Sequence, residues 1–168
     1  MRRFVELILI LAAFLLQSTF FKFISLGNVS PNLVLMLTAF FAFMCGKEDG
    51  MFAGLAAGLL TDVLYGNGII GIYTLIYVWI GYVCGAFNRI FFPEDVVLPI
   101  ILTTFSDIFC GFITYVLMFL LRTRLDILWY ILHVILPEAV YTLVMTILLF
   151  KPVLFIIQRL EVSSDRGL

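Results

Sequence analysis

The sequence predicts an all-α integral membrane protein with six transmembrane helices. Hydrophobic residues make up 64% of the 168 residues, charged residues only 12%, and the mean hydropathy is +1.18. Soluble proteins are about 45–50% apolar and about 25% charged. The apolar residues fall into six runs with short polar interruptions, which leave no room for a soluble domain. We therefore expect a single membrane domain over residues 1–168 that ends in a short polar cytoplasmic tail at 161–168.

The run lengths distinguish four full spans from two short ones. A helix needs about 20 apolar residues to cross about 30 Å of hydrocarbon, and the first and the last three runs meet this length. The second and third are shorter, so they form either two short helices or a re-entrant hairpin buried among the others. Ser30 before Pro31 predicts the N-cap of the second helix, and Asp49 is a candidate cap for the third. The expected spans are 4–21, 31–45, 50–65, 69–87, 98–121 and 131–154.

The distribution of lysine and arginine predicts that both termini are cytoplasmic. Six spans leave the termini on one side, and short cytoplasmic loops are enriched in these residues. With the termini inside, seven basic residues lie inside and three outside. The inside group is Arg2, Arg3, Lys47, Arg89, Lys151, Arg159 and Arg166, and the outside group is Lys22, Arg122 and Arg124.

Composition excludes several classes of ligand. The net charge of −1 and the absence of charged runs give no sign of nucleic-acid binding. Cys45, Cys84 and Cys110 are far apart, each within an apolar segment, and form no CxxC pair. Neither a disulfide framework nor a metal site is predicted, and no cofactor is expected.

Two carboxylates, Asp62 and Glu138, lie in apolar runs that contain no lysine or arginine. A charged side chain at the bilayer centre costs at least about 2.5–3.5 kcal/mol, so such residues usually face a bundle interior and mark a functional surface. The expected topology places both in the outer leaflet, at the level of Gln17, Asn32 and Tyr141, which predicts a polar binding site there. The simpler interpretation of Glu138 is a carboxyl group that only bonds neighbouring helices.

Two features shape the helices that carry these acids. Gly50, Gly54 and Gly58 recur at four-residue spacing, and such stripes let membrane helices approach closely. Pro137 precedes Glu138, removes a helical hydrogen bond and predicts a kink. The glycine stripe favours packing within the chain over contact with another protein.

Catalysis has little support in the sequence. His133, the only histidine, is five residues from Glu138 and so is turned away from it on a helix. No cluster has the spacing of a nucleophilic triad or a metal hydrolase. A paired-carboxylate protease would need Asp62 beside Asp107, but their expected depths differ by roughly a leaflet. We expect a protein that is not an enzyme.

The order of motifs resembles the MreD family across about residues 4–160. The matching segments are Gln17-Ser18-Thr19, Pro31-Asn32-Leu33, Gly46-Lys47-Glu48, Gly58-Leu59-Leu60-Thr61-Asp62, Gly71-Ile72-Tyr73 and Pro137-Glu138-Ala139-Val140-Tyr141. The family often has asparagine where Thr142 stands here. The resemblance implies a non-catalytic scaffold of the bacterial elongation machinery in the inner membrane. It also implies binding to an MreC-like single-span protein, and association with RodA, its transpeptidase and MreB filaments.

Two other functions stay open at this stage. The fold implied by the resemblance is similar to that of the substrate-binding subunits of energy-coupling-factor transporters, which bind a vitamin in an outward-facing pocket. The short, apolar outer loops of this chain argue against that function. A proton-conducting relay fits unpaired acids in a membrane, but a continuous chain of titratable groups is missing.

Overall fold

The computed structural model describes residues 2–23, 29–65, 71–89, 96–118 and 127–165, and these residues form six helices. The first five are single elements. The sixth is continuous through a short first segment, a π-helical turn and a long final segment. The elements are α1 (Arg2–Phe23), α2 (Leu33–Cys45), α3 (Lys47–Tyr65), α4 (Ile72–Phe87), α5 (Val97–Met118), α6 (Ile127–Tyr130), the π turn (Ile131–Ile135) and α7 (Leu136–Asp165).

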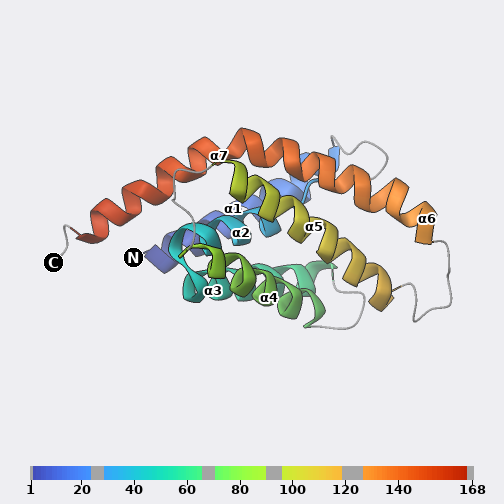
Figure 1. Ribbon diagram of the computed structural model, residues 1–168, viewed down its shortest axis with the longest axis horizontal. Coiled ribbons are helices and arrows are strands. Elements are labelled where there is room, and N and C mark those ends of the chain that lie inside the picture. The colour runs from blue at the N-terminus through green and yellow to red at the C-terminus, as the bar shows by residue number, and fades with distance from the viewer. Residues whose placement is uncertain (1, 24–28, 66–70, 90–95, 119–126, 166–168) are drawn as a thin grey trace.

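Successive helices run back and forth along the long axis of the molecule, so that α1 begins and α7 ends at the same end (Figure 1). We call this the N-terminal end, and the other, near α6, the opposite end. Two helices, Val97–Leu117 and Ile127–Arg159, are long and apolar enough to cross a membrane. The predicted all-helical architecture is therefore confirmed, while full crossing by all six helices and the orientation of the termini stay predictions.

Helix α2 occupies the centre of the bundle. Every residue from Leu33 to Met44 is buried, and α2 contacts α1, α3, α4, α5 and α7. A helix that is apolar on all sides is expected in such a position. Its N-cap is Asn32, whose side chain accepts a hydrogen bond from the Leu35 backbone N–H. The expected cap at Ser30 was therefore wrong, and α2 begins two residues after Pro31.

Helices α3 and α4 pack more closely than any other pair in the described part of the chain. A Cβ atom at Gly54 would overlap the backbone of Tyr77, and one at Gly58 would overlap the backbone of Thr74. The glycine stripe of α3 therefore lies directly against α4. Asp49 lies in the first turn of α3, which begins at Lys47. The expectation that Asp49 caps this helix was wrong, because the charged turn is itself helical.

The last helix changes its hydrogen-bond register just before Pro137. The backbone N–H of Leu136 donates to the carbonyl of Ile131, five residues earlier, which closes the π turn. A wider turn ahead of proline accommodates the ring and the missing N–H donor. Helix α7 continues past the expected end at residue 154, with Pro152 inside it, and is bent along its length (Figure 1).

Candidate functional site

Asp62 binds the N-terminus of α4. Its Oδ1 accepts a hydrogen bond from the Tyr73 backbone N–H at 3.0 Å, and its Oδ2 accepts one from the Thr74 N–H at 2.9 Å. The first N–H groups of a helix lack partners within it and carry a partial positive charge. Asp62 is only 1% exposed and continues the line of the glycine stripe on α3. Its charge is thus stabilised by α4 without a lysine or arginine.

Asn32 joins three helices. Its backbone N–H donates to Thr142 Oγ1 on α7 at 3.1 Å, and its Oδ1 accepts from the Tyr77 hydroxyl on α4 at 3.1 Å. Nearby, the Val34 N–H donates to Gln17 Oε1 on α1 at 3.3 Å. The predicted polar residues Gln17 and Asn32 therefore both bond the first turn of α2. Thr142 on α7 supplies the acceptor for the Asn32 backbone N–H.

Asp107 on α5 and Glu138 on α7 lie in the same region of the contact between these helices, because Gly111, one turn after Asp107, packs against Ile135, three residues before Glu138. Asp107 is 4% exposed, and both its carboxylate oxygens are without a hydrogen-bond partner among the described residues. Asn32 and Thr142 are near the same carboxyl group. The expected depths kept Asp107 apart from the outer site, whereas the structure brings it to Glu138. The signal that could have found it was the same one used for Asp62, an acid in an apolar run.

Tyr141 and Pro137 border a groove on the outer surface of α7. This cavity has a volume of about 490 Å³, and its lining is almost entirely apolar. The Tyr141 hydroxyl is buried and has no hydrogen-bond partner among the described residues. The residues that line the groove are Leu132, Leu136, Pro137, Val140, Tyr141 and Val144.

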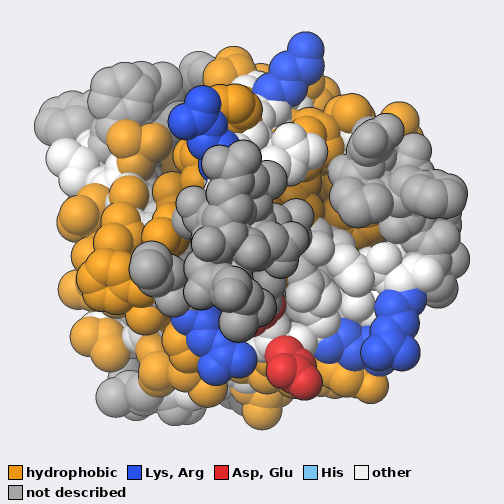
Figure 2. All heavy atoms as spheres, turned by 90° about the vertical axis from the view of Figure 1, so that its left-hand side faces the viewer, with side chains coloured by type: hydrophobic (Ala, Val, Ile, Leu, Met, Phe, Trp, Pro, Cys, Tyr) orange, Lys and Arg blue, Asp and Glu red, His pale blue; other side chains and the backbone are white. Residues whose placement is uncertain are grey.

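A second, polar cavity of about 840 Å³ lies at the N-terminal end. Figure 2 looks at this end and shows lysine and arginine side chains spread around it. Three basic residues, Arg3, Lys47 and Arg89, line the cavity together with Asn88, which donates to the Phe43 and Met44 carbonyls at 2.6 and 2.9 Å. These two bonds tie the end of α4 to the end of α2.

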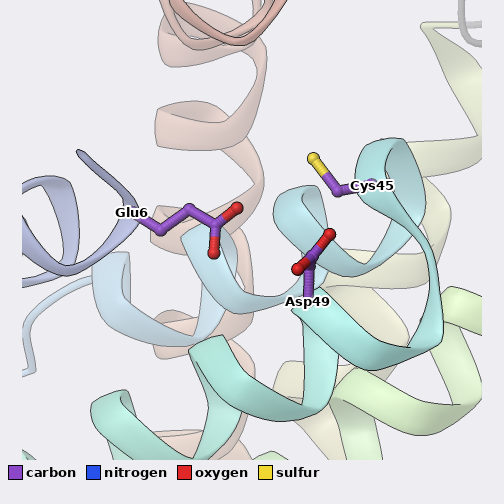
Figure 3. A group of neighbouring side chains, drawn as sticks. All are labelled: Glu6, Cys45 and Asp49. Atoms are coloured by element: carbon purple, nitrogen blue, oxygen red, sulfur yellow. The ribbon is translucent and has the colours of Figure 1, made fainter. Parts of the chain in front are cut away.

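Glu6, Cys45 and Asp49 converge beside this cavity from α1, α2 and α3 (Figure 3). One ligand atom of each lies within 4.8 Å of those of the others. Arg3 pairs with Asp49 at 3.6 Å and supplies positive charge to the group. From the sequence, Cys45 is expected to be only a small buried apolar residue, and the cluster is not predicted because its members lie on three different helices.

His133 lies apart from the acids discussed above. It is exposed, its Nδ1 is 3.0 Å from the Trp129 carbonyl oxygen, and its ring stacks on that of Trp129. Both contacts are within one turn of the last helix. They give His133 a local role at the end of the bundle near α6.

Comparison with protein families finds a match over nearly the whole chain. The family model described as rod shape-determining protein MreD matches residues 1–160. Neither a curated protein nor a solved structure matches.

Proposed function

Because the chain belongs to the MreD family of rod shape-determining proteins, we propose that it is a non-catalytic scaffold of the machinery that synthesises the lateral cell wall. Rod-shape determination is the role that the family assignment gives. The scaffold role is supported by what the polar residues do. The acceptors of Asp62 and Asn32 are used in bonds between helices, as is the amide of Asn88, and these bonds hold the bundle in one shape.

We place the chain in the bacterial plasma membrane as a multi-pass protein with cytoplasmic termini. The two long apolar helices and the basic residues at the N-terminal end support this orientation. The MreB filaments would then lie on the side of the cavity bordered by Arg3, Lys47 and Arg89. RodA and its transpeptidase would meet the chain within the membrane.

The partner that we propose for the groove beside Pro137 is the membrane helix of an MreC-like protein. The groove is apolar, and helices in a membrane associate mainly through van der Waals packing of complementary surfaces. Glu138 does not line this groove, and its role in partner binding stays a prediction.

Co-purification of an MreC-like protein tests this proposal. Val140 and Val144 line the groove, whereas Ile147 and Leu148 are exposed on α7 and do not line it. Val140→Trp and Val144→Trp should fill the groove and lower capture of the partner at least tenfold, while Ile147→Trp and Leu148→Trp should leave it unchanged. Equal capture by all four variants would overturn the docking site, and no capture by the unchanged chain would overturn the scaffold role.

The family assignment does not favour the alternative function, a substrate-binding transporter subunit. That function predicts a small molecule retained through purification. Native mass spectrometry of the purified chain tests for it directly, and a stoichiometric bound vitamin would contradict the scaffold proposal.

A further inference from the structure

The acids at the centre of the bundle differ in how their charge is balanced. Asp62 accepts three hydrogen bonds, two from the start of α4 and one from the Thr74 hydroxyl. Asp107 accepts none from the described residues, although it is 4% exposed, and the carboxyl group of Glu138 adds a second negative charge beside it. Asp107 is buried and Glu138 is half-buried, and two ionised carboxylates in such surroundings are costly unless positive charge or hydrogen-bond donors stabilise them.

The neutral neighbours of Asp107 can supply only hydrogen-bond donors. Both lone pairs of Asn32 Oδ1 are used by the Leu35 N–H and the Tyr77 hydroxyl, so Asn32 can offer only its amide N–H groups. Thr142 Oγ1 accepts from the Asn32 backbone N–H, which leaves its own O–H free to donate. Donors of this kind favour one ionised carboxylate but do not neutralise two.

The other groups that interact with the pair carry no positive charge. They are Tyr73 and Tyr77 from α4, Cys110 from α5 and Tyr130 from α6, all neutral when protonated. Lysine, arginine and histidine do not contribute among the described residues. One positive charge would therefore neutralise one of the two carboxylates. The hydrogen-bond donors of Asn32 and Thr142 would stabilise the other.

We propose that Asp107 and Glu138 bind one monovalent cation, a proton or Na⁺, between α5 and α7. Unpaired acids inside membrane proteins commonly serve as proton or ion sites. Because α5 and α7 pack on one another and on the central helix α2, the bound cation would set how tightly they associate. This property goes beyond the proposed scaffold role and does not depend on it.

The experiment measures the thermal unfolding midpoint of the full chain in detergent. NaCl is compared with choline chloride at equal ionic strength, and each salt is measured across a series of pH values. A ligand present at about 100 times its Kd should raise the midpoint by about 5–10 °C. If Na⁺ is bound, the midpoint rises with NaCl and not with choline chloride. If a proton is bound, the midpoint falls as the pH rises, whichever salt is present.

Asp107→Asn and Glu138→Gln should each abolish the shift, and if one variant does not fold, the other decides. Asp62→Asn is the matched control, because this buried acid already has its donors. It should lower the midpoint and keep the dependence on Na⁺ or pH. The proposal would be overturned if the midpoint of the unchanged chain depended on neither Na⁺ nor pH. It would also be overturned if Asp107→Asn and Glu138→Gln kept the same dependence as the unchanged chain.

Discussion

The backbone N–H and the hydroxyl of Thr74 both donate to the same carboxylate oxygen of Asp62, at 2.9 and 2.5 Å. Asp62 lies one turn beyond Gly58, whose missing side chain lets the start of α4 come this close. Asp62, one of the two acids that were anomalous in the sequence, is therefore a capping group supplied by one helix to the next. Its charge faces the positive end of α4.

Removing this cap should destabilise the chain. Asp62→Ala leaves the half-buried N–H groups of Tyr73 and Thr74 without their acceptor, so we expect a loss of about 1–3 kcal/mol. Asp62→Asn keeps one acceptor oxygen and should lose less. The thermal midpoint in detergent measures both, with Val63→Ala, an exposed neighbour on α3, as the control. A loss after Asp62→Ala no larger than that after Val63→Ala would contradict the capping role.

The glycine stripe predicts a second effect on stability. Gly54→Ala places a Cβ against the Tyr77 backbone, which cannot rotate away as a side chain can. We expect a loss of about 1–3 kcal/mol from overpacking, despite the helix propensity gained. Gly111→Ala on α5 is the matched control, because its new Cβ meets only the flexible side chain of Ile135, at 3.1 Å. Equal midpoints for the two variants would mean that α3 and α4 are not packed this closely.

The hydrogen bond between Asn32 and Thr142 predicts a third effect of a substitution on stability. Thr142→Val keeps the shape of the side chain but removes the acceptor for the Asn32 backbone N–H, at a cost of about 1–3 kcal/mol. Thr142→Ser should retain most of the stability. Thr146→Val serves as the control, because the Thr146 hydroxyl bonds only the Thr142 carbonyl in its own helix. Losses of the same size at positions 142 and 146 would show that the contact with α2 adds nothing.

Hydropathy predicted the helices, and the reason is that each segment must satisfy its own backbone in an apolar environment. It could not predict which polar residues meet. The depth of a side chain in the membrane follows from its position in its apolar run, and this position placed Asp107 away from the outer polar residues. In the structure, α5 packs against α7, and Gly111, one turn after Asp107, lies against Ile135, three residues before Glu138. Asp107 therefore meets Glu138, and the pairing depends on helix lengths and offsets that only the folded bundle fixes.

The same limit applies to Asn32. The sequence predicted that the second helix begins near Pro31, and in the structure Asn32 is the N-cap of α2. That its side chain would also accept a bond from Tyr77 on α4 could not be read from local sequence. Such contacts depend on α2 being the central helix. The signal for that central position was present in the uniformly apolar residues 33–45, which no polar face interrupts.

The topology itself gives the last prediction. Glu48 and Leu128 are exposed and lie on α3 and α6. In a chain without its native cysteines, Glu48→Cys should react with a membrane-impermeant maleimide only from the cytoplasmic side, and Leu128→Cys only from outside. The reason is that α2 and α3 meet at Gly46, where a φ of 97° turns the chain back, so full crossing places this turn inside.

A re-entrant hairpin formed by α2 and α3 would give a different pattern. Both its ends would lie outside and its turn within the membrane, so Glu48→Cys would not react from the cytoplasm. Lys151→Cys, exposed on α7 towards the cytoplasmic end, controls for access to the inner side in the same preparation. Labelling at Lys151→Cys without labelling at Glu48→Cys would replace the six-span topology by one with four full spans. The groove would keep its place in that topology, because all its lining residues belong to the last helix.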